Sequence, residues 1–366
     1  MSRYLCCAAL ILVGAVTGCE PAQIPEWSSS EKLKALENAE QRDKIVAELA
    51  SAFGTPLKPA RPGADDTERE HLRLGAQVYA KRCVQCHGVS GDGAGPAAEF
   101  LKPRPRDYRQ GTFKFTSTPY GVRPRREDLI RTVREGVVGT SMPSFALLPP
   151  TELAAVVDYV ILLSQRGETE VLWTAYTEAE EEMEFNDVYQ EVLASWQLGA
   201  ESVVRPLTVM PAMTPESIEL GRQAFLSEGC SKCHGPDGRG KTQDNVGTDV
   251  WGFPTNAADI TAGMLHGGQR PIDIYRRISS GINGTPMPSF RAVFDPEGKD
   301  PATAKNPDTM WHLVHYVLHV ANQRRATLPP EPSLRAPRPA EATATSESSA
   351  ASETPSEGAA APEGGE

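Results

Sequence analysis

The sequence predicts an all-α protein built from two similar domains, because an internal repeat begins and ends in helical patterns. Each copy opens with a Leu-Gly-x-Gln run and a following aromatic residue, from Leu74 to Tyr79 and from Leu220 to Phe225. Each copy closes with a Tyr-Val pair, at Tyr159 and at Tyr316. In the first closing segment, apolar residues recur at the spacing of one helix face: Leu153, Val156, Val157, Val160 and Ile161.

Signals for helix starts precede both copies. Thr67 and Glu70 have the spacing of a capping box, in which each side chain accepts a backbone N–H bond from the other residue. Thr214 precedes Pro215, and proline suits the first helical position because that residue needs no N–H donor. From about residue 28 to 53, a thin apolar stripe predicts one further helix.

Composition divides the rest of the chain into segments around these two domains. A stretch rich in proline and glycine precedes the first domain, an acidic stretch follows it, and the end is rich in Pro, Ala, Ser and Glu. We expect the end to be disordered because it has few apolar residues to bury. The predicted segments are a signal peptide (1–18), a helical arm with its linker (19–66), domain one (67–166), an acidic helical linker (167–213), domain two (214–326) and a tail (327–366).

The charge of the chain argues against a nucleic-acid-binding function. The 366 residues carry a formal net charge of -11, which is unfavourable next to a phosphate backbone. Ten acidic and no basic residues lie between Glu168 and Glu201. We therefore expect protein partners and a membrane rather than nucleic acid.

The first residues resemble the signal peptide of a bacterial lipoprotein. Arg3 is followed by an apolar stretch from Tyr4 to Thr17, which is too short to span a bilayer comfortably. The stretch ends in Val-Thr-Gly-Cys, and the resemblance implies cleavage before Cys19 and lipid attachment to it. An ordinary signal peptide or an uncleaved apolar anchor are the alternatives. The favoured interpretation places the mature protein on the periplasmic side, anchored to a membrane by lipid.

The remaining cysteines form two Cys-x-x-Cys-His motifs, one in each copy of the repeat. Of seven cysteines, Cys6 and Cys7 leave with the signal and Cys19 is the lipid site, so no thiol remains for another role. The two thiols of each motif can bond the two vinyl groups of one porphyrin, and the histidine can then ligate its iron. Zinc is disfavoured because the three groups are too crowded for a tetrahedral site. The sequence predicts two haem c groups, attached at Cys83, Cys86, Cys230 and Cys233.

Both copies resemble the class I cytochrome c family, over roughly residues 67–166 and 214–325. That family packs its first and last helices through a glycine and two aromatic residues. The resemblance implies that Gly75 and Tyr79 meet Tyr159, and that Gly221 and Phe225 meet Tyr316. The family also fixes the histidine with a proline carbonyl. Pro254 fits that role in the second copy, whereas Pro103 and Pro105 both fit in the first.

The same resemblance implies one methionine ligand for each iron. His87 and His234 would be the proximal ligands, and Met142 and Met287 the distal ones. Each methionine lies in a Met-Pro-Ser-Phe run, 55 and 53 positions after its histidine. A thioether ligand favours reduced iron and raises the reduction potential relative to a second histidine.

Three further groups of residues have weaker functional interpretations. His312, His315 and His319 share a helix face and could bind a metal, although a polar helix face is the usual outcome. His266 and Met264 could compete as ligands of the second iron. An arginine cluster could hold haem propionates or an acidic partner, or could simply be solvated surface; its members are Arg104, Arg106, Arg109, Arg123, Arg125 and Arg126.

These features predict an electron carrier without catalytic residues, because both axial positions of each iron are filled. The expected partners are other redox proteins or membrane respiratory complexes, and the chain could itself be a fixed subunit of a larger oxidoreductase. The alternative is a dihaem enzyme of the cytochrome c peroxidase or thiosulfate-oxidising type. A peroxidase must open one iron to peroxide and usually has two unlike haem sites, whereas these two sites are alike.

Overall fold

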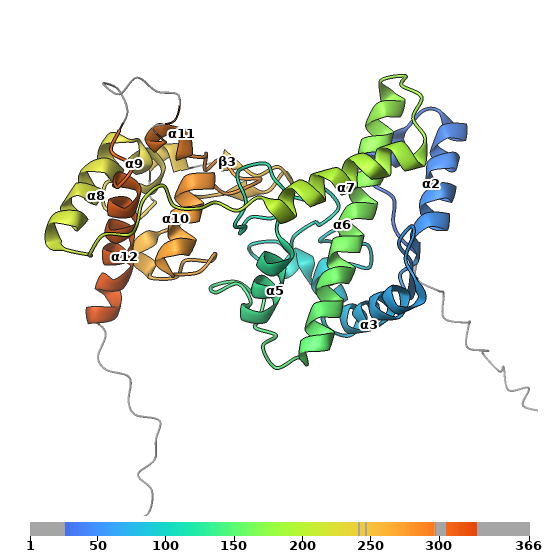
Figure 1. The fold of residues 1–366 in the computed structure, drawn as a ribbon, viewed down its shortest axis with the longest axis horizontal. Coiled ribbons are helices and arrows are strands. Elements are labelled where there is room, and N and C mark those ends of the chain that lie inside the picture. Colours follow the sequence, from blue (N-terminus) through green and yellow to red (C-terminus); the bar gives the residue numbers. More distant parts are fainter. Residues whose placement is uncertain (1–25, 241, 246, 296, 298–304, 328–366) are drawn as a thin grey trace, which may run out of the picture. The chain divides into compact units, whose positions relative to one another are not determined.

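Helices dominate the chain, and the predicted all-α class is confirmed. The computed structural model describes residues 26–240, 242–245, 247–295, 297 and 305–327 (Figure 1). The α-helices are α1 (Glu31–Ala35), α2 (Ala39–Phe53), α3 (Asp66–Arg82), α4 (Val84–His87), α5 (Arg126–Glu135), α6 (Pro150–Glu178), α7 (Phe185–Glu201), α8 (Pro215–Ser227), α9 (Cys230–His234), α10 (Pro271–Ser280), α11 (Arg291–Phe294) and α12 (Thr309–Thr327).

Short elements complete the description. Three 3₁₀ turns are η1 (Ala98–Phe100), η2 (Gln243–Asn245) and η3 (Ile260–Ala262). Two antiparallel pairs of two-residue strands are β1 (Gly54–Thr55) with β2 (Lys58–Pro59), and β3 (Gly247–Thr248) with β4 (Pro254–Thr255). Gly54 faces Pro59 in the first pair, and Gly247 faces Thr255 in the second.

In the first repeat, α3 crosses α6 at Gly75. A Cβ atom on Gly75 would overlap the Ala155 carbonyl oxygen and lie 2.9 Å from the Tyr159 Cβ atom. The rings of Tyr79 and Tyr159 pack beside this point, with centroids 5.2 Å apart. The predicted contact of Gly75 and Tyr79 with Tyr159 is therefore confirmed.

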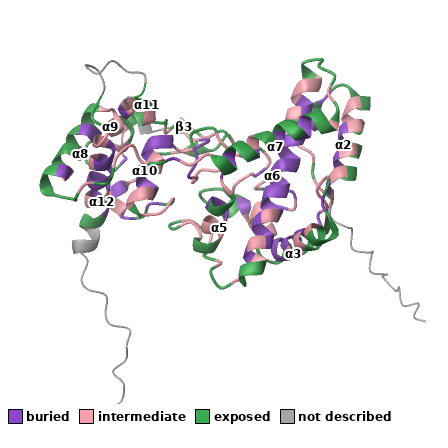
Figure 2. Cartoon of the chain, viewed as in Figure 1, coloured by how far each residue is buried: buried purple, intermediate pink, exposed green. Residues whose placement is uncertain are grey.

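The second repeat has the same crossing, between α8 and α12. A Cβ atom on Gly221 would overlap the His312 carbonyl oxygen and lie 2.9 Å from the Tyr316 Cβ atom. The centroids of Phe225 and Tyr316 are again 5.2 Å apart. Buried residues run along both closing helices, α6 and α12 (Figure 2).

The predicted helix starts have mixed outcomes. At α8 the Thr214 side chain accepts the Ser217 N–H bond at 3.1 Å and Pro215 is the first helical residue, as predicted. At α3 the capping box of Thr67 and Glu70 is wrong. Asp65 caps the helix instead and accepts the Glu68 N–H bond at 2.8 Å, because it lies two residues earlier with an equally good acceptor.

The acidic segment is helical, as expected, but it packs on the first repeat as well as joining the two repeats. Helix α6 continues beyond Arg166, so the boundary predicted there falls inside a helix. Trp173 on this extension is 1% exposed, and its ring nitrogen donates to the Met183 carbonyl at 3.1 Å. Helix α7 then packs back with Val188 and Tyr189, which belong to the core of the first repeat. The segment therefore has an apolar helix face that packs on the core, although most of its charged residues are acidic.

One of these acidic side chains is buried and joins three segments of the first repeat through hydrogen bonds. Glu168 is 6% exposed, accepts a bond from Arg123 at 2.6 Å and accepts another from the Trp196 ring nitrogen at 2.8 Å. Burial raises the pKa of Glu168, and both donors oppose that rise. The extension of α6 is therefore tied to the loop before α5 and to α7.

The N-terminal arm packs on the same core. Leu33, Ile45, Leu49 and Phe53 are fully buried within the cluster that contains Tyr79 and Tyr159. No helix in the described part of the chain is both long enough and apolar enough to cross a membrane. The predicted signal peptide with Cys19, and residues 328–366 of the predicted tail, lie outside the described residues.

We expect Gly75→Ala to destabilise the protein, although alanine is normally the better helix former. The added methyl group would overlap the Ala155 carbonyl oxygen, and forcing a carbon into a packed contact costs about 1–3 kcal/mol. The free energy of unfolding can be measured by guanidinium titration followed by circular dichroism.

Gln77→Ala is the matched control, because Gln77 lies on the exposed side of the same helix. It should change the free energy of unfolding by less than about 0.5 kcal/mol. If α3 and α6 did not cross at Gly75, the alanine variant would instead be more stable by roughly 0.5–1 kcal/mol through helix propensity.

Candidate functional site

In the second repeat the four predicted site residues surround one cavity. The cavity has a volume of about 530 Å³, and Cys230, Cys233, His234 and Met287 all line it. Cavities that hold cofactors usually measure about 300–1,000 Å³. Helix α9 supplies the cysteines and the histidine, while the loop after α10 supplies the methionine. Two thiols, an imidazole and a thioether on one largely apolar cavity fit a covalently attached haem.

The His234 ring is held in the orientation of a metal ligand. Its Nδ1 atom lies 3.1 Å from the Ala258 carbonyl oxygen. A carbonyl can only accept a hydrogen bond, so Nδ1 carries the proton and Nε2 keeps a free lone pair. Burial lowers the pKa of His234, which also favours the neutral ring.

The first repeat holds His87 in the same way. Its Nδ1 atom donates to the Arg106 carbonyl oxygen at 3.1 Å, and its ring stacks on Tyr108 with centroids 4.8 Å apart. Burial lowers the pKa of His87 to about 4, so the ring is neutral at physiological pH. The sequence had suggested Pro103, Pro105 or Pro254 as the source of the fixing carbonyl. That is wrong in both repeats, where Arg106 and Ala258 supply it.

The cysteines are poor sites for thiolate chemistry. Burial raises the pKa of Cys83 to about 12 and that of Cys230 to about 11. Metal coordination and disulfide exchange both need the thiolate, which these surroundings disfavour. Within the described residues, no group of three or more His, Cys, Asp or Glu side chains is arranged to hold a metal ion. A neutral thioether bond to a porphyrin agrees with both observations.

The two methionine loops have matching internal hydrogen bonds. In the first, Val137 N–H donates to the Met142 carbonyl at 3.1 Å, and the Thr140 hydroxyl donates to the Val137 carbonyl at 2.8 Å. In the second, Ile282 N–H donates to the Met287 carbonyl and the Thr285 hydroxyl to the Ile282 carbonyl, at the same two distances. The threonine two residues before each methionine positions the loop, a role that the sequence analysis did not predict.

A glycine with positive φ starts each loop. Gly136 has φ of +70° and Gly281 has φ of +69°, which disfavours any side chain there. A Cβ atom on Gly136 would lie 2.5 Å from the Pro143 carbonyl carbon, and one on Gly281 would lie 2.6 Å from the Pro288 carbonyl carbon. The proline after each methionine is therefore packed directly against the end of the preceding helix.

The weaker candidates of the sequence have identifiable partners. The Ser217 hydroxyl lies 2.7 Å from His312 Nδ1 and 2.6 Å from His315 Nδ1, whereas His319 contacts Gln323. His266 also lines the second cavity, but its Nδ1 atom is 2.5 Å from the Val138 carbonyl oxygen. Met264 is half exposed and is not part of the cavity lining.

The arginine cluster is mostly engaged within the protein. Four members pair with carboxylates, in the pairs Arg109–Asp107, Arg123–Glu168, Arg125–Glu127 and Arg126–Asp158. The other two lie over aromatic rings of the second repeat, Arg104 over Phe253 and Arg106 over Trp251.

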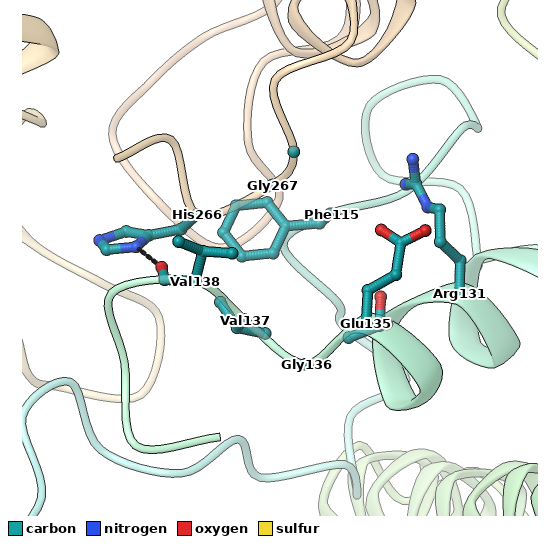
Figure 3. Close-up of a pocket in the computed structure, with 10 residues that line it drawn as sticks. Phe115, Arg131, Glu135, Gly136, Val137, Val138, His266 and Gly267 are labelled. Atoms are coloured by element: carbon teal, nitrogen blue, oxygen red, sulfur yellow. Dashed lines mark hydrogen bonds between the residues drawn. The ribbon is translucent and has the colours of Figure 1, made fainter. Parts of the chain in front are cut away.

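Equivalent positions of the two methionine loops contact the opposite repeat. Val138, four residues before Met142, meets His266 at a small cleft between the repeats (Figure 3). Asn283, four residues before Met287, accepts the Gly121 N–H bond at 2.9 Å. The loops that carry the two predicted distal ligands are thus among the parts through which the repeats contact each other.

Arg106 contacts the surroundings of both sites. Its carbonyl fixes His87, and its guanidinium carbon lies 3.4 Å from the centroid of the Trp251 ring. Trp251 in turn packs on the second methionine loop, since a Cβ atom on Gly284 would lie 2.5 Å from the ring. Burial lowers the pKa of Arg106 to about 10, so it remains a cation at neutral pH.

Comparisons with known proteins agree with this geometry. Residues 70–160 match the family model described as cytochrome C oxidase, cbb3-type, subunit III, and residues 218–321 match the cytochrome c model. The chain is 23% identical over 195 residues to the Cbb3-type cytochrome c oxidase subunit CcoP of Helicobacter pylori. That match covers 53% of this chain and 45% of the subunit, so the chain spans less than half of that relative's length.

One solved structure is similar over a larger share of the chain. It is a chain of the reducing HAO-like protein complex of Kuenenia stuttgartiensis, with 30% sequence identity and a TM-score of 0.51. The match covers 68% of this chain and 95% of that chain.

We expect the contact between Arg106 and Trp251 to couple the two repeats energetically. A cation over an indole ring that is shielded from water contributes about 0.5–2 kcal/mol. A double-mutant cycle of Arg106→Ala and Trp251→Leu, measured by denaturant unfolding, should give a coupling energy in that range.

Arg134→Ala with Trp251→Leu is the matched cycle, because Arg134 is exposed on α5 and makes no side-chain contact with Trp251 among the described residues. It should give no coupling. Equal coupling in the two cycles would mean that the stacking at Arg106 does not join the repeats.

Proposed function

We propose that the chain, which contains two cytochrome c domains, carries two haem c groups and transfers single electrons between redox proteins on the periplasmic side of a bacterial membrane. Its two cytochrome c domains indicate an electron carrier. The observation that supports two similar haem sites most directly is that each repeat contains the same histidine clamp and the same methionine loop.

The residues of the chain would work by holding both sides of each haem. Cys83 and Cys86, or Cys230 and Cys233, form the covalent bonds, while His87 and His234 present Nε2 because their Nδ1 atoms donate to backbone carbonyls. Met142 and Met287 would supply a second ligand to each iron. Bound haem iron cycles between Fe(II) and Fe(III). Rigid ligand loops suit that task because little has to reorganise when one electron arrives or leaves.

Filled axial positions distinguish a carrier from an enzyme. A peroxidase or a thiosulfate-oxidising enzyme needs one iron that is open to substrate. Here the second cavity is bordered by both a histidine and a methionine, and the first methionine loop has the same hydrogen bonds as the second. These observations support a pair of like, closed sites.

Membership of a larger redox complex is the more specific form of this proposal. The similar proteins are a subunit of an oxidase and a chain of an HAO-like complex. The N-terminal arm and the acidic segment pack on the core of the first repeat through their apolar faces. Only their outer polar faces would be available to partners.

Anchoring through Cys19 would hold the carrier beside membrane respiratory complexes. The support for it is the short apolar stretch that ends in Val-Thr-Gly-Cys. Acyl chains stabilise such an anchor by burying methylene groups, each contributing about 0.8 kcal/mol.

We expect the mature protein to contain two covalent haems, both six-coordinate with His and Met ligands. Mass spectrometry should show two haem additions, and Cys233→Ala should impair attachment in the second domain alone. Both oxidised haems should show the weak near-infrared absorption of iron–thioether coordination. Met287→Ala should speed cyanide binding at the second haem only, and Met142→Ala, its matched variant, at the first only.

A protein with one haem, or with zinc, would refute the dihaem proposal. Rapid cyanide binding by an unaltered haem, together with turnover of peroxide or a sulfur substrate, would leave two haems in place but favour the enzyme.

We expect Cys19→Ser to abolish lipid attachment. The variant should appear as a soluble form or as an uncleaved precursor, whereas the native protein should fractionate with membranes and carry lipid on its first residue. Mass spectrometry of the mature N-terminus checks this. An unmodified N-terminus beyond residue 19 would contradict the proposal.

A further inference from the structure

Arg277 is the unexplained cation of the second cavity. It lies on α10 and lines the cavity with Ile274 and Ile278 from the same helix. Its Nη2 atom donates to the Gly268 carbonyl at 2.7 Å. Its Nη1 atom is buried and has no hydrogen-bond partner within the described part of the chain. A buried charged donor without an acceptor is costly, because it has lost its bonds to water and gained none in return.

The neighbouring carboxylate does not relieve this cost. Asp273, one turn earlier on α10, is bound by Arg270 through two bonds of 2.9 Å and by Arg131 from the first repeat. Both Asp273 oxygens are therefore occupied by other guanidinium groups. An acceptor for Arg277 Nη1 has to come from the cavity itself.

The first repeat closes the same end of the cavity. Lys114 and Phe115 both line it, and a Cβ atom on Gly267 would lie 2.6 Å from the Phe115 ring. The Lys114 ammonium is already 3.3 Å from Asp249, and His266 contacts the Val138 carbonyl. At this end of the cavity, Arg277 is thus the cation with a side-chain N–H group, at Nη1, that has no acceptor among the described residues.

We propose that Arg277 binds a propionate carboxylate of the second haem, at the cavity edge that Phe115 and Lys114 of the first domain close. This inference rests on the proposed haem at that site. The two propionates are the anionic groups of a haem c, and a planar guanidinium matches a carboxylate better than any other side chain does. The bond would orient the second haem with its propionates toward the first domain.

The position of Arg277 makes this site specific to the second domain. Gly136 follows the last residue of α5, and Gly281 follows the last residue of α10 in the same way. Thr132 and Arg277 each lie four residues before that glycine, so they occupy equivalent positions in the two repeats. The Thr132 hydroxyl donates to the Asp128 carbonyl of its own helix at 2.9 Å. The first domain therefore has no cation at the equivalent point.

The test compares Arg277→Gln with Arg276→Gln, the matched control. Arg276 is adjacent on the same helix and contacts the Val204 carbonyl instead of the cavity lining. At pH 8 the loss of the Arg277 cation should disfavour reduced iron. The reduced-to-oxidised ratio of the second haem should fall about tenfold at a given potential, which is about 59 mV for one electron. The first haem should be unchanged, and Arg276→Gln should leave both nearly unchanged.

A pH titration separates this role from a merely structural one. With Arg277 present, the propionate stays ionised and the potential of the second haem should be flat between about pH 5 and 8. In Arg277→Gln the propionate pKa should rise, so the potential should increase as pH falls through that range. The charged or titratable neighbours Asp273, Arg131, Lys114 and His266 remain in both variants and serve as the common background.

A second variant keeps the test decisive if Arg277→Gln does not fold. Arg277→Lys retains the charge but loses the two-donor geometry, so the propionate bending band of the second haem should shift in the resonance Raman spectrum. An unmoved band, or a flat and unshifted potential in Arg277→Gln, would overturn the proposal. Mass spectrometry tests the dihaem proposal separately from the Arg277–propionate bond. If every variant carries two haems but the bond is disproved, the proposed function still stands.

Discussion

The close crossing of two helices at a glycine positions the predicted haem histidine of each repeat. Gly75 and Gly221 bring the first helix of each repeat against backbone carbonyls of the last helix, so no larger residue fits without movement. In the first repeat the Tyr79 hydroxyl, at the crossing, donates to the Gly88 carbonyl at 2.9 Å. That bond ties the crossing to the residue directly after His87. In the second, the Phe225 ring lies 6.2 Å from the His234 ring. A shift of the helices would therefore move the imidazole.

Features that recur in both repeats could be predicted from the sequence because they depend on side chains with few substitutes. The crossing glycines and their aromatic partners are examples, and the structure has them in contact. The carbonyls that orient the histidines were missed because every residue has a carbonyl, so Arg106 and Ala258 carry no signal in their side chains. The packing of the acidic segment was missed because its many charged residues suggested an exposed segment. The spacing of Trp173, Val188 and Tyr189 was the signal that it packs on the core.

The methionine loops show how local sequence can specify a site twice. A glycine with positive φ, a threonine that caps the turn and a proline against the preceding helix recur in both loops with nearly equal distances. None of these contacts needs the rest of the protein. The ligand geometry of the two sites is therefore alike for local reasons, and their differences must come from residues that reach them from elsewhere in the fold.

Those distant residues make the electrostatic surroundings of the two sites unequal. The second cavity is bordered by Arg277 and by Lys114 of the first repeat, whereas Thr132 replaces the arginine in the first. A cation close to a haem stabilises Fe(II) relative to Fe(III), since the iron centre gains one negative charge on reduction. If both irons have the proposed histidine and methionine ligands, this difference would favour the second haem as the place where an electron rests. Arg106 lies between the repeats, over Trp251, and its charge acts on both sites. The packing of one repeat against the other thus does more than fix their distance, because Lys114 and Arg106 of the first repeat place charge beside the proposed haem site of the second.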